Sequence, residues 1–245
     1  MAANEAVHRT ILIFDIEQSN HPMRTNRDRV VIHEAMYAAV RTALKRVKYY
    51  HEDRGDGVLV LVPPEVPKGR LVSNLLARLE AALGIHNAAM ERQNASRAAA
   101  TQVRLRVAVH AGEVTFDGHG VVGAAVDYTF RLADAPPFKA ALATSTGVCA
   151  LITSSWFFHE VVQQNPDARP ELFRRIDTQV KSTPISAYIR VPGEISLAEQ
   201  WPPDQLPEEQ FPEVKILAQL SGAPELGARR WLPPPQPTGR GPRWI

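Results

Sequence analysis

The chain has 245 residues, of which 44% are hydrophobic and 22% are charged, so a globular core is expected. A formal net charge of +2 gives no electrostatic reason to expect nucleic acid or a membrane surface as a partner. The single cysteine, Cys149, excludes an intramolecular disulfide framework and is typical of a reducing compartment. The N-terminus has no apolar signal region, and no run approaches the roughly 18 apolar residues of a membrane span. We therefore expect a cytoplasmic protein that does not enter a membrane.

The first part of the chain alternates apolar runs with a helical pattern. Residues 10–16 (TILIFDI) are apolar and rich in β-branched side chains, which predicts a buried strand. Residues 27–47 carry apolar side chains at helical spacing and predict an amphipathic helix. Residues 49–62 (YYHEDRGDGVLVLV) then predict a hairpin that turns at Arg54–Gly57.

The same alternation continues to residue 191. Leucines spaced four residues apart over 71–83 predict a second amphipathic helix, and polar residues 91–102 predict a loop after it. A second hairpin is expected to fold at 117–120, and a helix over 124–135 is expected to close at the two following prolines. The last expected elements are a strand at 149–153, a helix at 154–163, and strands at 174–180 and 185–191.

This order of elements predicts an α+β fold, with helices packed on a sheet around a ferredoxin-like βαββαβ core. We expect residues 1–192 to form this domain. Eleven of the twenty prolines lie from Pro192 onward, so residues 193–245 are predicted to be a mostly irregular, Pro-rich tail. Tryptophans within this tail favour docking to a protein partner; they are Trp201, Trp231 and Trp244.

Two aspartates stand at positions where a charge needs a partner. Asp15 lies near the end of the first apolar strand, and Asp56 lies in the turn of the first hairpin. In a ferredoxin-like sheet these two places come level, and a divalent cation would remove the repulsion between the carboxylates. The alternative is that Asp15 caps the following turn and that Asp56 only supplies turn chemistry.

Four separated motifs, one of them in two segments, resemble the class III nucleotidyl cyclase family, the catalytic domain of adenylate and guanylate cyclases. The segment ILIFDIEQSN resembles the family's opening strand and metal-binding turn, and EDRGDGVLVLV resembles its central hairpin. The segments LRVAVHAGEV and GHGVVGAAVDYTFRLADA together resemble its long signature, a strand, hairpin and helix. VKSTPISAYIRV resembles its closing stretch, in which a lysine precedes the last strand.

The resemblance implies a phosphoryl-transfer site. Asp15 and Asp56, assisted by the carbonyl of Ile16, would hold two Mg²⁺ or Mn²⁺ ions, which activate a ribose 3′-hydroxyl and neutralise a triphosphate. Arg131 matches the arginine that stabilises charge on the α-phosphate, and Lys181 matches the lysine that meets the triphosphate. The product would be a 3′,5′-cyclic monophosphate, with pyrophosphate released.

The two positions that read the base in this family correspond to Glu52 and Gly120. Adenylate cyclases carry a lysine where this chain has Glu52, and guanylate cyclases carry a glutamate. A carboxylate can accept hydrogen bonds from N1–H and N2–H₂ of guanine, so GTP is favoured as the substrate. Gly120 has no side chain to select a base. A pyrimidine triphosphate stays open as an alternative, since the resemblance is to a family in which some members use one.

The chain also departs from the family pattern. The asparagine that the family places four residues before Arg131 is Asp127, which adds negative charge beside a polyanionic substrate. Residues 17–20 (EQSN) and Ser182 after the lysine are also atypical. Two hypotheses follow from the resemblance. One is an active cyclase, as a homodimer or as a heterodimer with a related domain; the other is a degenerate domain that dimerises or binds nucleotide as a regulatory module.

Overall fold

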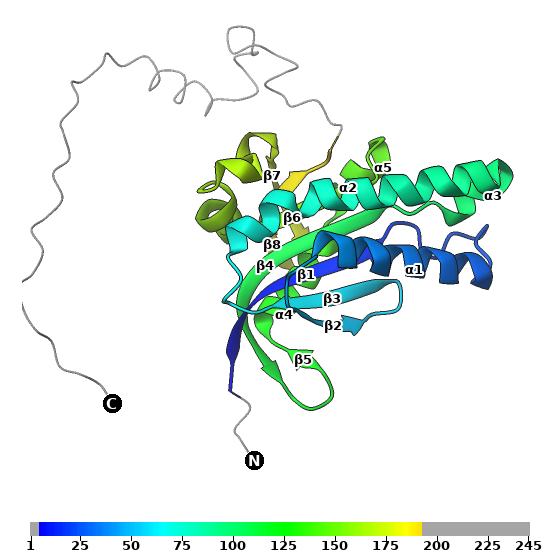
Figure 1. Cartoon of the computed structure of the whole chain (residues 1–245). Coiled ribbons are helices and arrows are strands. Elements are labelled where there is room, and N and C mark those ends of the chain that lie inside the picture. Colours follow the sequence, from blue (N-terminus) through cyan, green and yellow to red (C-terminus); the bar gives the residue numbers. More distant parts are fainter. Residues whose placement is uncertain (1–4, 193–245) are drawn as a thin grey trace, which may run out of the picture. The chain divides into compact units, whose positions relative to one another are not determined.

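The protein is described from a computed structural model, in which residues 5–192 are placed (Figure 1). The strands are β1 (Val7–Ile16), β2 (Tyr50–Asp53), β3 (Gly57–Val62), β4 (Leu105–Phe116), β5 (Val121–Val122), β6 (Cys149–Ser154), β7 (Arg174–Val180) and β8 (Thr183–Arg190). The α-helices are α1 (Asn26–Ala43), α2 (Lys68–Gln93), α3 (Ala95–Thr101), α4 (Ala124–Ala133), α5 (Pro136–Thr144) and α6 (Ser155–Phe157). Short turns of π-helix and 3₁₀-helix follow α6 at Phe158–Val162, Pro166–Ala168 and Pro170–Leu172.

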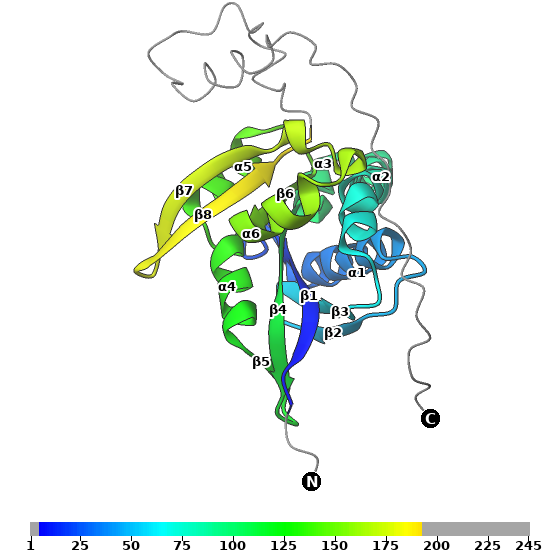
Figure 2. The same cartoon turned by 90° about the vertical axis from the view of Figure 1, so that its left-hand side faces the viewer.

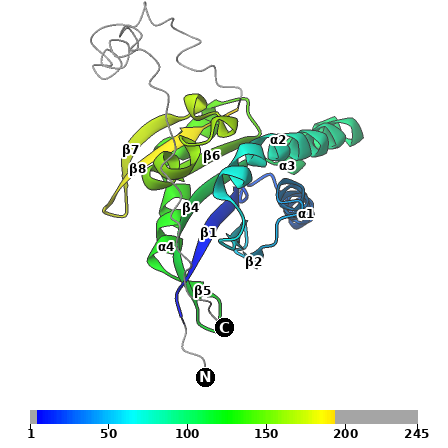
Figure 3. The ribbon, with the colours of Figure 1, turned by 60° about the vertical axis from the view of Figure 1, so that its left-hand side comes forward.

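The strands form one sheet in the order β2-β3-β1-β4-β6-β8-β7, with β5 paired to β4. Strand β1 pairs antiparallel with both β3 and β4, so the first four long strands have the order of a ferredoxin-like core. Helix α1 and helix α4 lie on opposite faces of this sheet (Figure 2 and Figure 3). The predicted α+β fold with a ferredoxin-like core is therefore confirmed.

Two apolar layers, one on each face of the sheet, hold the fold together. Alternate residues of β1 point to opposite faces, so Leu12 and Phe14 pack with the α1 and α2 side chains while Ile11 and Ile13 pack with those of α4 and α5. Strand β3 is buried along its whole length because helices cover both of its faces. This explains why its sequence is an unbroken apolar run and does not alternate with polar residues.

The prediction of a loop over 91–102 is wrong, because the chain there is almost entirely helical. Helix α2 continues to Gln93, and α3 follows after one residue. The Asn87 side chain bonds both backbone groups of Val103, at 2.8 and 3.0 Å, and ties the end of α3 back onto α2. The polar residues and the alanine run of this segment include good helix formers. Such residues can form an exposed helix when tertiary contacts hold it in place.

The remaining boundaries agree with the prediction in type but differ in detail. Helix α4 ends at Ala133, and Pro136 does not only close it: the proline begins α5, where a missing N–H costs nothing. The predicted helix over 154–163 is α6 continued by a turn of π-helix. The predicted tail from 193 lies outside the described residues, as do its tryptophans. In the described part, no helix has the length and apolar character needed to span a bilayer.

Candidate functional site

The fold brings Asp15 and Asp56 to one place. Asp15 is paired with Gly57 across the β1–β3 ladder, and the N–H of Ile16 donates to the carbonyl of Asp56 at 3.0 Å. Both aspartates line a cavity of about 290 Å³ at the end of β1. Gly57 is required there, because a Cβ at this position would collide with the carbonyl oxygen of Phe14. The prediction that the two acidic residues come level is thus supported by the strand register.

Arg106 of β4 forms an ion pair with Asp15 that sequence reasoning did not find. The Arg106 Nε donates to Oδ2 of Asp15 at 2.7 Å, and a second guanidinium nitrogen contacts the same oxygen. The two side chains are only 14% and 22% exposed. A charged residue that interrupts the apolar strand 105–109 was the available signal, since Arg106 lies directly opposite Asp15 in the β1–β4 register.

Burial governs the protonation of Asp15. Loss of hydration raises the pKa of this carboxyl, Arg106 opposes the rise by charge and by hydrogen bonding, and Asp56 adds to it by repulsion. Asp56 itself accepts a hydrogen bond from the Ser19 hydroxyl at 2.8 Å, from the atypical turn after β1. The site therefore holds two carboxylates and one engaged arginine, and Lys139 lines the same cavity.

The donor set fits a hard divalent cation. Mg²⁺ and Mn²⁺ prefer oxygen ligands, and one carboxylate oxygen each of Asp15 and Asp56 has no partner in the described chain. Ile16 follows Asp15 directly, and its N–H donates to the backbone carbonyl of Asp56, so this residue lies beside both aspartates. No group of three or more His, Cys, Asp or Glu side chains suited to a metal occurs in residues 5–192. Any cation here would rest on these two carboxylates and would compete with Arg106.

Lowering the pH should weaken Mn²⁺ binding to this site. The metal needs the Asp15 carboxylate, and because its pKa is raised, protons compete at a higher pH than for an ordinary aspartate. Calorimetric titration with Mn²⁺ from neutral to mildly acidic pH should show the affinity falling through the raised pKa. An Asp15→Asn variant should bind more weakly and lose this dependence. Equal pH dependence in the two proteins would show that Asp15 is not a ligand.

The two predicted base-reading positions also lie together. Glu52 is on β2, and a Cβ placed on Gly120 would come 3.1 Å from Glu52 Oε1. The Glu52 carboxylate accepts from the Tyr50 hydroxyl at 2.9 Å and forms an ion pair with Arg54. Arg54 also lines the Asp15–Asp56 cavity, and its Cζ lies over the Phe130 ring, 5.7 Å from the ring centroid. This arginine therefore connects the two carboxylate sites.

Within residues 5–192, the other predicted residues form no hydrogen bond or ion pair with Asp15, Asp56 or Glu52. Asp127 lies in the first turn of α4 and Arg131 one turn further, yet no ion pair between them is present in residues 5–192. Lys181 is at the tip of the β7–β8 hairpin, where it and Ser182 have φ values of 46° and 64° (Figure 2). A single chain therefore presents an acidic half-site and, separately, the residues expected to meet phosphate.

Three solved structures have a similar fold. The guanylyl cyclase Cya2 matches at 18% identity over 80% of this chain and 99% of that one, with a TM-score of 0.52. The catalytic core of a rhodopsin-guanylyl cyclase with converted specificity, in complex with ATPαS, matches at 14% identity over 78% and 100% (TM-score 0.51). A bacterial light-regulated adenylyl cyclase matches at 13% over 77% of this chain (TM-score 0.52), and this chain spans 53% of its length.

The described part of the chain therefore has the fold of a class III nucleotidyl cyclase catalytic domain, as its sequence motifs predicted. No protein-family model and no curated protein matches the sequence. At these levels of identity the likeness to solved structures concerns the fold alone.

Proposed function

We propose that this protein is a metal-dependent nucleotidyl cyclase that converts a nucleoside triphosphate to its 3′,5′-cyclic monophosphate and pyrophosphate. The observation that carries the proposal is the pair of carboxylates, Asp15 and Asp56, that face one cavity at the mouth of two buried strands. A cyclase-like fold with this acidic pair retained in register supports catalysis more than a purely structural role.

The residues divide the chemistry between them. Asp15, Asp56 and the Ile16 carbonyl would hold two Mg²⁺ or Mn²⁺ ions, which when bound supply charge neutralisation and make the 3′-hydroxyl more acidic. The 3′-hydroxyl loses its proton to solvent, and its oxygen forms a bond to the α-phosphorus as the bond to the pyrophosphate oxygen breaks. Arg131 stabilises the charge that develops on the α-phosphate, and Lys181 meets the triphosphate oxygens that leave as pyrophosphate.

A complete site needs a second chain. Within residues 5–192 the acidic pair forms no hydrogen bond or ion pair with Arg131 or Lys181. A head-to-tail homodimer, or a heterodimer with a related domain, would place Arg131 and Lys181 of one chain against Asp15 and Asp56 of the other. The side chains of Asp127 and Arg131 on α4 have no hydrogen-bond or ion-pair partner in the described chain. Arg131 is therefore available to contact a nucleoside triphosphate. We expect catalysis to depend on protein concentration for this reason.

GTP is the substrate that Glu52 favours, with a pyrimidine triphosphate as the alternative. The Glu52 carboxylate packs beside Gly120, where even a Cβ would come 3.1 Å from its Oε1, so the glycine leaves room for the Glu52 side chain. Its ion pair with Arg54 must loosen for a guanine to be read, because the hydrogen bonds to N1–H and N2–H₂ need both carboxylate oxygens.

A regulatory module is the second candidate, and one specific observation favours it. Arg106 already neutralises Asp15, so the fold satisfies this carboxylate without a metal. Asp127 also favours a regulatory module, because it places a negative charge where the family has the amide of an asparagine. A domain of this kind would dimerise or bind nucleotide without turning it over.

Incubation of the purified chain with each of the four NTPs and Mn²⁺, followed by identification of the products, separates the two candidates. Formation of a cyclic nucleotide, most rapidly from GTP, supports the enzyme. Binding of NTP without any cyclic product from the four substrates would refute the enzyme and leave the regulatory module.

Replacing Asp127 by Asn should raise the rate of cyclisation by about tenfold or more, since one transition-state donor at such a site contributes at least that much. The variant removes a negative charge that faces the triphosphate and restores a donor. The measurement is kcat with GTP and Mn²⁺. Asp177→Asn is the matched control, because Asp177 is exposed on β7 in an ion pair with Arg175. An unchanged or lower kcat in Asp127→Asn would show that Asp127 is not what limits the rate.

A further inference from the structure

A second cavity, of about 330 Å³, lies between the end of α1 and the start of α2. It is formed by the connection from α1 to β2 and by the connection from β3 to α2, so it is at the open end of the β2–β3 hairpin. The turn that carries Asp56 is at the closed end of the same hairpin. Since β3 spans roughly 20 Å, this cavity is separate from the candidate cyclase site.

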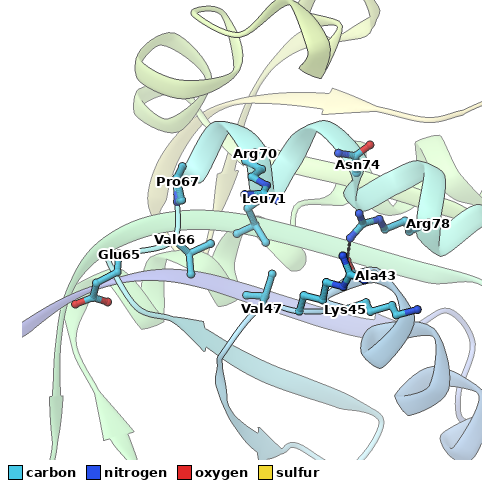
Figure 4. Close-up of a pocket in the computed structure, with 11 residues that line it drawn as sticks. Ala43, Lys45, Val47, Glu65, Val66, Pro67, Arg70, Leu71, Asn74 and Arg78 are labelled. Atoms are coloured by element: carbon cyan, nitrogen blue, oxygen red, sulfur yellow. Dashed lines mark hydrogen bonds between the residues drawn. The ribbon is translucent and has the colours of Figure 1, made fainter.

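Four cationic side chains line this cavity: Lys45, Arg46, Arg70 and Arg78. Glu65 is the one acidic side chain among its lining residues. Figure 4 shows Glu65 at the opposite end of the cavity from Lys45 and Arg78. No ion pair joins Glu65 to any of the four within residues 5–192. Arg78 donates to the carbonyl of Ala43 at 3.2 Å, which fixes its guanidinium at the cavity wall.

The other three cations have no hydrogen-bond or ion-pair partner in the described chain. Arg46 is also held in a left-handed conformation, with φ of 66°, which a non-glycine residue adopts only at a cost. Like charges gathered in one cavity repel one another, and an anion removes that repulsion. For comparison, the chain as a whole carries a net charge of only +2.

The beginning of α2 adds to the attraction for an anion. The helix has 26 residues, its N-cap Pro67 provides no side-chain hydrogen bond, and its first turn has no acidic residue. Its first N–H groups and its positive dipole end are therefore open beside the cations. Val47, Val66 and Leu71 give the cavity an apolar part of its wall, and Asn74 adds a polar side chain (Figure 4).

We propose that this cavity binds a phosphate-bearing small molecule, with its phosphate among the four cations and its less polar part against the apolar wall. Arginine forks suit phosphate oxygens better than they suit a single carboxylate, and three arginines contribute here. The volume is within the range of small-molecule sites. This inference goes beyond the proposed cyclase activity and does not depend on it.

Pyrophosphate is the probe for the test, titrated calorimetrically into the full-length chain in metal-free buffer. We expect saturable binding with one equivalent per chain, and an affinity that falls with added salt. The double variant Arg46→Gln/Arg70→Gln should bind at least about tenfold more weakly, because each arginine supplies charge-assisted hydrogen bonds. Both side chains are exposed, so the variant should fold normally, which its thermal unfolding curve will verify.

Arg29→Gln/Arg92→Gln is the matched control. It removes the same charge from exposed positions at the other ends of α1 and α2 and should leave the affinity unchanged. Equal affinities of the wild type and the Arg46/Arg70 variant would overturn the proposal and place pyrophosphate elsewhere, including the cyclase site. If both double variants weakened pyrophosphate binding equally, the effect would come from the change in net charge alone, and the proposal would also be overturned. Citrate binding as tightly as pyrophosphate would refute the preference for phosphate.

Discussion

Replacing Asp56 by Asn should abolish formation of cyclic nucleotide while leaving the fold and the dimer intact. The substitution keeps the side chain's size and its contact with Ser19 but removes half of the negative charge that would hold the metal ions. Loss of a direct metal ligand should exceed the roughly 10–100-fold effect that outer-shell changes have. The amide should also leave folding unharmed, because Asp56 lies in a turn and its backbone carbonyl still accepts from Ile16.

Three measurements check this prediction. Initial rates with the preferred NTP and Mn²⁺ give the loss of activity, size-exclusion chromatography reports the dimer, and thermal unfolding reports the fold. Asp177→Asn, on the exposed face of β7, provides the same change of charge away from the site and should keep its rate. Retained activity in Asp56→Asn would refute the assignment of the metal to this pair of aspartates. Loss of the dimer together with the activity would show a structural role instead.

Replacing Arg106 by Gln should destabilise the metal-free protein by about 2–3 kcal/mol, below the roughly 3–5 kcal/mol that breaking a fully buried ion pair costs, since this pair is partly exposed. The variant leaves Asp15 desolvated and next to Asp56, with no positive charge bound to it. Mn²⁺ should then recover more stability in the variant than in the wild type, because the metal no longer competes with a guanidinium for Asp15. Chemical denaturation with and without Mn²⁺ measures both effects.

A matched variant separates the ion pair from the simple loss of an arginine in the sheet. Arg9 is on β1, where its guanidinium donates to the backbone carbonyl of His8 and pairs with no carboxylate in the described chain. Arg9→Gln should therefore change stability little and should not alter the response to Mn²⁺. If Mn²⁺ stabilised Arg106→Gln no more than the wild type, the acidic pair would not be a metal site, and the regulatory alternative would gain support.

The competition between Arg106 and a cation decides between the two candidate functions. In an active cyclase, metal and triphosphate together must outweigh the ion pair, and the arginine must turn away or share its carboxylate. In a regulatory domain the ion pair would persist in every state. Two experiments address this question. The Arg106→Gln experiment measures metal binding, and the assay with four NTPs measures turnover.

The sequence alone determined the type and order of nearly every element. Apolar runs and helical spacing are local properties, so the strand at residues 10–16 and the helices around 27–47 and 71–83 were predictable from the sequence pattern. The two tight turns were also predictable, because each contains glycine. In the structure Gly55 and Gly118 have φ values of 82° and 88°, which glycine tolerates best. The loop assigned to 91–102 failed because the helix there depends on contacts from Asn87, which a local pattern does not contain.

Only the tertiary structure decided which charges meet. Asp53, for example, is bound by the Tyr37 hydroxyl at 2.6 Å and by the N–H of Gly55, which explains a carboxylate that the motif left without a role. Arg106 is 91 residues from Asp15 in the sequence, and the four cations of the second cavity come from the α1–β2 connection and from helix α2. Pairings of this kind follow from strand register and helix packing, which are set by burial over the whole domain and not by neighbours along the chain.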